Sequence, residues 1–200
     1  MKELFIKNSI SLITNYNKNY TEEDIEKIKY GLEGLYLTIT KLIVIFLISI
    51  IFNFFKELLI MLIFFNIIRF PAFGFHADKS ITCLIISTTL LLGLTYIMIN
   101  TPMTITNKAL ISLICLIGYI LFAPADTVKR PLTNAKKRKY RKVASICCAT
   151  AYIVIILLIN EMILSNIILT ALIVECIMIN PIMYKLFGMP YNNYKNTIKT

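Results

Sequence analysis

Six apolar segments follow one another along the 200-residue chain, and only short loops separate them. They cover residues 35–55, 57–70, 81–99, 109–123, 143–159 and 162–179. A helix needs about 20 largely apolar residues to cross the hydrocarbon core of a bilayer. Charged residues make up only 16% of the chain, whereas about a quarter of a soluble domain is charged. We therefore predict an all-α, polytopic integral membrane protein with about six transmembrane or membrane-embedded helices.

This layout predicts one integral membrane domain over residues 1–200. It would consist of a cytoplasmic amphipathic N-terminal segment at 1–34, membrane helices at 35–180 and a cytoplasmic tail at 181–200. Segment 57–70 is short for a span, so it either crosses the bilayer or is re-entrant. The N-terminal residues 3–13 are weakly amphipathic and form either a helix on the inner leaflet or an ordinary surface helix.

The sequence Thr-Glu-Glu-Asp at residues 21–24 has the spacing of a helix capping box. In such a box the hydroxyl of the first residue and the acid three residues later satisfy free N–H groups at the start of a helix. The three acids also lie near the positive end of the helix dipole. A helix is therefore expected to begin here, ahead of the first apolar segment.

The loop between the fourth and fifth apolar segments, residues 123–142, is strongly basic. It contains one acid, Asp126, and eight cations: Lys129, Arg130, Lys136, Lys137, Arg138, Lys139, Arg141 and Lys142. Loops rich in lysine and arginine stay in the cytoplasm and contact anionic lipids. If every segment crosses, both termini and the loop at 71–80 are cytoplasmic as well. Nucleic-acid binding is disfavoured, because the net charge of +10 is concentrated in this membrane loop. Asp126 is expected to shape the loop.

The only histidine, His76, lies seven residues before Cys83 in the sequence FGFHADKSITC, residues 73–83. Pro71 and Gly74 end the preceding helix, and the next helix can begin at Asp78 or Ser80, both good N-cap residues. Cys83 then lies in the first turn, where free N–H groups and the helix dipole favour a thiolate. An imidazole folded back onto this turn would act as the general base for the thiol, and the two groups together are sufficient for cysteine-type acyl transfer. The alternative is a solvated histidine and a cysteine that only packs in the core.

No metal or cofactor site is expected. One histidine and five scattered cysteines lack the ligand spacing of a zinc site, and the chain has no glycine-rich phosphate loop. The odd number of cysteines, in or beside apolar segments, also argues against a disulfide framework.

Three features together resemble the AgrB family, membrane endopeptidases that process the AgrD precursors of bacterial cyclic autoinducing peptides. These are Arg69, the G-x-H-A motif at residues 74–77 followed by Cys83, and the segment APADTVKRPL at 123–132 with its basic continuation. The length, the hydropathy layout and the basic loop also fit, so the resemblance covers nearly the whole chain.

The resemblance implies that Cys83 is the nucleophile and His76 the general base and acid, supported by Arg69 and Gly74. It implies cleavage on the carboxyl side of the future ring, an enzyme thioester, and release of a thiolactone or lactone peptide. Asp78 either orients His76 or caps the following helix. The protein would lie in the bacterial cell membrane, with its active site on the cytoplasmic side, and a homodimer is compatible with six short spans. The basic residues would hold the acidic C-terminal part of an AgrD-like precursor: Lys129, Arg130, Lys136, Lys137 and Arg138.

Two charged residues inside apolar segments leave alternatives open. Arg69 is either a cation that reaches the lipid headgroups or a donor to the substrate. Glu175 is either protonated or paired with Arg69 or Lys41, and a structural pair is the prediction. An alternative function, a non-catalytic small-peptide transporter or export partner, would use Glu175 and the positive inner loop.

Overall fold

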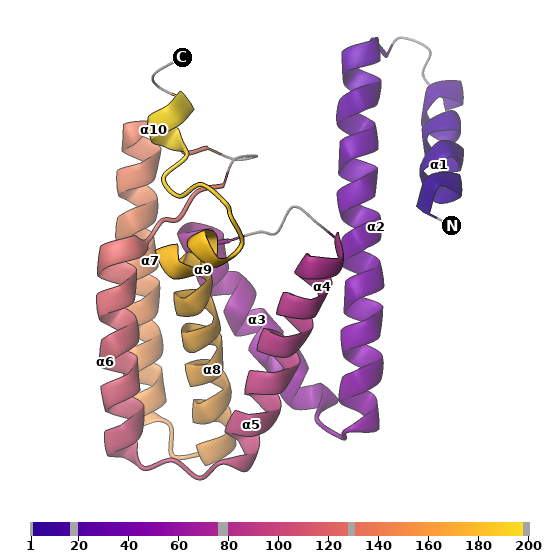
Figure 1. Cartoon of the computed structure of the whole chain (residues 1–200). Coiled ribbons are helices and arrows are strands. Elements are labelled where there is room, and N and C mark those ends of the chain that lie inside the picture. The colour runs from indigo at the N-terminus through magenta and orange to yellow at the C-terminus, as the bar shows by residue number, and fades with distance from the viewer. Residues whose placement is uncertain (1, 17–19, 76–79, 128–130, 198–200) are drawn as a thin grey trace. The chain divides into compact units, whose positions relative to one another are not determined.

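The computed structural model describes residues 2–16, 20–75, 80–127 and 131–197 (Figure 1). Apart from an isolated β-bridge, the regular structure in these ranges is helical, so the predicted all-α class is confirmed. The helices are α1 (Lys2–Tyr16), α2 (Glu22–Ile51), α3 (Phe55–Ala72), α4 (Ser80–Thr88), the π-helical turn η1 (Thr89–Gly93), α5 (Leu94–Asn100), α6 (Ile105–Phe122), α7 (Ala135–Leu158), α8 (Met162–Ile179), α9 (Pro181–Leu186) and α10 (Tyr194–Thr197).

The chain forms two compact units, residues 1–51 and 52–200. In the first unit α1 packs on α2, and the rings of Phe5 and Tyr36 have centroids 5.5 Å apart. The expected capping box is present, because the Thr21 backbone N–H donates to Asp24 Oδ2 at 3.1 Å and the Asp24 N–H to Thr21 Oγ1 at 3.3 Å. From this cap, α2 continues without a break to Ile51, so the predicted apolar segment 35–55 extends four residues past the end of the helix, through the turn and into the first residue of α3.

Helix α8 is the centre of the second unit and contacts α3, α5, α6 and α7 (Figure 1). It is apolar on all sides, with a run of buried residues from Ser165 to Leu172. A helix of this kind must be covered by protein or lipid on every face. The apolar segment predicted at 81–99 forms α4, η1 and α5 in direct succession.

Among the described residues, four helices are long and apolar enough to cross a membrane: α2, α6, α7 and α8. A shorter apolar helix covers Leu84–Asn100. Helix α3 has 18 residues, but Lys56, Glu57 and Arg69 lie within it. We call the end of the second unit where α3, α6 and α8 finish and α7 begins the basic end, because the cations of the 123–142 loop lie there.

Candidate functional site

The chain changes direction sharply at the end of α3, immediately before His76. Phe73 and Gly74 both have positive φ angles, 64° and 106°. The Gly74 N–H donates to the Ala125 carbonyl at 2.9 Å, and the Ala125 N–H donates to the Ala72 carbonyl at 3.0 Å. These bonds form a parallel bridge between Phe73 and Ala125. We call residues 72–75 the hinge; it is joined to the APAD segment, 123–126.

Phe75, the last residue before His76, is held on both sides of its backbone. Its N–H donates to the Met178 carbonyl at 2.7 Å, and its carbonyl accepts from Arg69 Nη2 at 3.0 Å. The Phe75 ring is buried and packs edge-on against Tyr184, with centroids 5.7 Å apart. The position at which the chain enters the His76 loop is therefore fixed by three separate helices.

An ion pair lies beneath the hinge. Arg69 Nη1 donates to Glu175 Oε2 at 2.9 Å, and the Glu175 side chain is fully buried. Of the alternatives left open by the sequence, the pair with Arg69 is thus the one that forms. A buried carboxylate without a partner costs several kcal/mol, which explains why an acid inside α8 needs an arginine on α3.

Gly74 is required by both conformation and space. Its φ of 106° lies in a region that residues with a side chain rarely adopt. A Cβ atom there would lie 3.1 Å from Glu175 Oε1 and 3.3 Å from Arg69 Nη1. The glycine therefore allows the hinge backbone to approach the ion pair directly.

The buried carboxylate of Asp126 organises the APAD segment. It accepts backbone N–H groups from Leu132 at 3.2 Å, Asn193 at 2.8 Å and Tyr194 at 2.8 Å. The Tyr184 hydroxyl lies 3.1 Å from the Asp126 carbonyl, and burial raises the pKa of Tyr184, so the hydroxyl stays protonated as a donor. The prediction that Asp126 shapes the loop is confirmed, and the C-terminal tail is part of the same network.

Arg141 connects α7 to the hinge. Its Nη1 donates to the Phe70 carbonyl at 2.5 Å, and its guanidinium lies 4.1 Å from the centroid of the Phe73 ring. Phe70 lies in the last turn of α3, where carbonyls lack partners within the helix and attract cations. Arg141 therefore caps α3 from a different helix.

Several predicted site residues lie outside the described residues: His76, Asp78, Lys129 and Arg130. Helix α4 is described from Ser80 onward and includes the Cys83 backbone. The choice between the two predicted starts falls on residues outside the described ranges and stays a prediction. The Cys83 side chain is outside the described part of the chain. The proximity of imidazole and thiol therefore stays a prediction.

The described cations of the proposed substrate-binding set are arranged differently from one another. Lys136 and Lys137 are exposed in the first turn of α7. Arg138 instead stacks on the Tyr194 ring, 3.9 Å from its centroid, and donates to the Leu132 carbonyl at 3.3 Å. The basic run is thus partly built into the loop rather than wholly exposed.

Two residues that help to build the site, Tyr184 and Asn193, are absent from the sequence-based predictions, and Arg141 is named there only as one cation of the basic loop. Each contacts a segment about 58 to 71 positions away in the chain. Helical periodicity carries no information on such contacts. The two tyrosines and two asparagines at 191–194 were the available hint that a polar tail folds onto the protein.

The model of the family accessory gene regulator B, AgrB, matches residues 6–179. The chain belongs to the AgrB family. Similar AgrB-like proteins include one from Clostridium acetobutylicum, 34% identical over 92% of this chain and 90% of its own length. Another, from Listeria innocua, is 29% identical over 87% of this chain and 85% of its own length. No solved structure matches the chain.

The AgrB match covers the hinge, the Arg69–Glu175 pair and the APAD segment. It ends at Ile179, the last residue of α8. The tail that binds Asp126, including Asn193 and Tyr194, therefore lies beyond the matched region of this AgrB-family chain. Among the described residues, no group of three or more histidine, cysteine or acidic side chains could hold a metal ion.

Proposed function

We propose that this AgrB-family protein is a membrane cysteine endopeptidase that cleaves an AgrD-like propeptide on the C-terminal side of its future ring. The observation that carries the proposal is the hinge. Its backbone is bonded to α3, α8 and the APAD segment up to Phe75, directly before His76. The next helix, α4, is described from Ser80 onward and contains the Cys83 backbone. Such a rigid approach suits a catalytic loop.

In the proposed reaction, the Cys83 thiolate attacks the scissile carbonyl. The new carbon–sulfur bond forms as the carbon–nitrogen bond breaks, and His76 first accepts the thiol proton and then delivers it to the leaving amine. The acyl group remains on Cys83 as a thioester. A thiol or hydroxyl of the precursor then attacks the thioester, which releases a thiolactone or lactone and regenerates the Cys83 thiol.

The remaining site residues have supporting roles in this proposal. Arg69 and Gly74 keep the hinge in place, and Asp78 orients His76 or caps α4. Positive side chains around the start of α7 attract the acidic C-terminal part of the precursor. The proposed substrate-binding residues are Lys129, Arg130, Lys136, Lys137 and Arg138.

The proposed setting is the bacterial cell membrane. About six helices cross or enter the bilayer as one membrane domain, and an amphipathic segment precedes them. Both termini and the active site face the cytoplasm, because the basic loop is retained there and contacts anionic lipids. A homodimer is the proposed assembly. Cysteine-accessibility labelling from each side of intact cells tests the orientation: labelling of a cysteine at Lys136 only from outside would overturn it.

The direct test is co-expression with a candidate precursor, followed by mass spectrometry of the peptides. Wild-type protein is expected to give a truncated, cyclised product, and Cys83→Ala and His76→Ala to give none. Cys147→Ala is a matched control, because Cys147 is an exposed cysteine of α7 outside the hinge. Normal product formation by Cys83→Ala would disprove the peptidase mechanism.

The alternative, a small-peptide transporter, would tolerate Cys83→Ala. It depends on Glu175 as a membrane carboxylate that meets a solute. That carboxylate is fully buried and bonded to Arg69, which favours the peptidase. Transport of an already cyclised peptide by the Cys83→Ala variant would instead support the transporter.

A further inference from the structure

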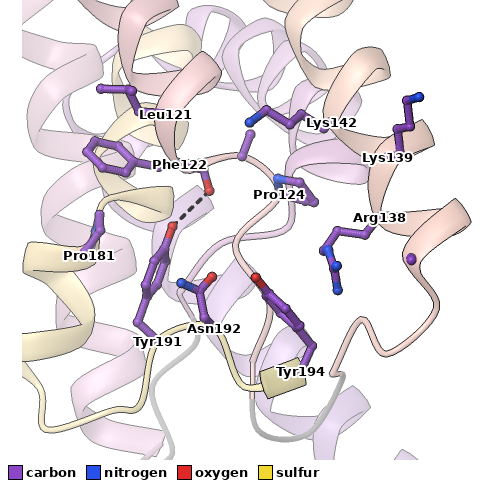
Figure 2. Close-up of a pocket in the computed structure, with 12 residues that line it drawn as sticks. Leu121, Phe122, Pro124, Arg138, Lys139, Lys142, Pro181, Tyr191, Asn192 and Tyr194 are labelled. Carbon is purple, nitrogen blue, oxygen red and sulfur yellow. Dashed lines mark hydrogen bonds between the residues drawn. The ribbon is translucent and has the colours of Figure 1, made fainter. Parts of the chain in front are cut away.

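A pocket of about 550 Å³ lies at the basic end, between the end of α6, the start of α7 and the tail (Figure 2). Its polar side includes Arg138, Lys139 and Lys142 of α7 together with Tyr191 and Tyr194 of the tail. Each of its lining residues is described, and none is acidic. The lining is therefore positively charged, and the neighbouring acid Asp126 lies behind it, with its carboxylate bonded to the Tyr194 backbone N–H at 2.8 Å.

Two of the cations that line the pocket, Lys142 and Arg138, have defined orientations. Figure 2 shows Lys142 extending from α7 toward Phe122 and Pro124, whereas Lys139 points away along the rim. Arg138 is fixed by the Tyr194 ring, 3.9 Å from its centroid. An arginine held in this way keeps its planar donors in a fixed position, which suits an oxyanion such as phosphate.

Tyr191 does not supply a negative charge to the pocket. Its hydroxyl donates to the Phe122 carbonyl at 3.1 Å, and burial raises its pKa to about 12. The tyrosine therefore stays neutral at physiological pH. It closes one side of the pocket and leaves the lysine and arginine groups as the charged part of the wall.

The pocket also lies where the surface changes from charged to apolar. Leu121 at its edge is 62% exposed, and Val143, next to Lys142, is 53% exposed. Ile182, which follows the lining residue Pro181, is 71% exposed. A ligand with a negative head and hydrocarbon chains matches both surfaces, whereas an acidic peptide matches only the charged one.

We propose that this pocket binds the phosphate headgroup of an anionic phospholipid, with the acyl chains lying along the exposed apolar ends of α6 and α7. Only some of the cations on α7 line the pocket, which supports a specific site rather than general charge attraction. Lys136 and Lys137 belong to the same helix and are exposed, but they do not line the pocket. This proposal does not depend on the peptidase activity.

The test is native mass spectrometry of the full-length protein, released from nanodiscs that contain equal amounts of phosphatidylglycerol and phosphatidylcholine. The wild type is expected to retain phosphatidylglycerol selectively. The double variant Arg138→Gln/Lys142→Gln is expected to retain about 25-fold less, because each cation that contacts the bound headgroup contributes on the order of a fivefold preference for anionic lipid and the two factors multiply. Lys136→Gln/Lys137→Gln removes the same charge from the same helix and is expected to retain lipid within about twofold of wild type.

Equal losses in the two double variants would overturn the pocket in favour of general charge attraction. Lys142→Gln alone provides a second measurement if loss of the Arg138–Tyr194 contact prevents folding. Among the described residues, the Lys142 ammonium makes no hydrogen bond or ion pair, so this variant is expected to fold and still to lose several-fold of the bound phosphatidylglycerol. Full retention by this folded variant would contradict the proposal.

Two competing ligands test whether the bound anion is a lipid headgroup, a free phosphate or an acidic peptide. Inorganic phosphate and a soluble glutamate-rich peptide are titrated against the lipid-loaded protein. The lipid proposal expects neither to displace phosphatidylglycerol at concentrations equal to that of the lipid. Displacement by inorganic phosphate would show a simple anion site, and displacement by the peptide would assign the pocket to a peptide instead; either result overturns the lipid proposal.

Discussion

Two buried polar clusters lie near opposite ends of α8, and they are built in different ways. Near its C-terminal end, Glu175 forms an ion pair with Arg69 at 2.9 Å. Near its N-terminal end, Ser165 accepts from the buried Lys108 ammonium, and Asn166 donates to the Met98 carbonyl at 2.7 Å. Within the described part of the chain, Lys108 makes no ion pair with an acid. Only the first cluster adjoins the hinge.

The comparison shows that buried charges in one helical bundle can have different structural roles. The Arg69–Glu175 pair holds a backbone turn in place, because Arg69 also donates to the Phe75 carbonyl at 3.0 Å. Lys108 instead joins α6 to α8 through a neutral hydroxyl. We expect mutations in the first cluster to affect both folding and processing, and mutations in the second to affect packing alone.

The largest effect is expected for Arg69→Ala. It leaves Glu175 buried without its partner, which costs about 3 kcal/mol, and it removes the donor to Phe75. Thermal unfolding in nanodiscs and mass spectrometry of a co-expressed precursor would measure stability and processing. Arg69→Met/Glu175→Met is expected to recover stability but not product, because the Phe75 carbonyl still lacks its donor. Recovery of both would show that the pair acts on folding only.

Gly74→Ala is expected to have the next largest effect on stability and processing. The new Cβ would lie 3.1 Å from Glu175 Oε1, at a φ of 106°, and such backbone strain costs on the order of 1–3 kcal/mol. Product formation should fall steeply, while insertion into the membrane is retained. Gly34→Ala is the matched control: a Cβ there meets nothing within 4 Å, so both readouts should match those of the wild type. Wild-type processing by Gly74→Ala would contradict the proposed role of the hinge.

Arg141→Gln should have a smaller effect of about 1 kcal/mol, because it removes a cation from the C-terminal end of α3. Product yield is expected to fall several-fold, since the α3 end and the Phe73 ring lose a shared contact. Lys139→Gln removes an equal charge from an exposed position of α7 outside the proposed substrate-binding set and serves as the control for general electrostatics. Identical yields from the two variants would show that Arg141 acts only through its positive charge and not through its contacts with the end of α3.

The smallest effect is expected for Lys108→Met. Replacing a buried cation by an apolar side chain of similar length is often neutral, so the unfolding free energy should change by less than about 1 kcal/mol. Processing should be unchanged in the co-expression assay. A loss of product as large as that of Arg69→Ala, in a protein that still folds, would remove the distinction between the two clusters.

The sequence predicts the helices well because membrane helices are long and apolar. The segment predicted at 162–179 coincides with α8, and the segment at 81–99 differs by one residue at each end from the α4–α5 run. Glu175 was expected to need a partner for the same physical reason, the cost of a buried charge. Hydropathy therefore predicts the helices and the need of Glu175 for a partner, whereas the structure identifies that partner as Arg69.

The contacts around the APAD segment could not be predicted in this way. Asp126 binds Asn193 and Tyr194, which are 67 and 68 residues away. These bonds use backbone N–H groups of an irregular tail, so neither side-chain type nor periodicity identifies the partner. The positive φ of Phe73 is likewise a result of tertiary contacts, because no local signal requires it there.

The return of the tail to Asp126 has a practical consequence for anyone who purifies this protein. A chain shortened to residue 190 would lose two of the three backbone N–H groups that Asp126 accepts. An affinity tag is better attached after the final residue through a flexible linker than used to replace the last ten. Protease trimming of the C-terminus would, for the same reason, loosen a segment that is hydrogen-bonded to the turn before His76.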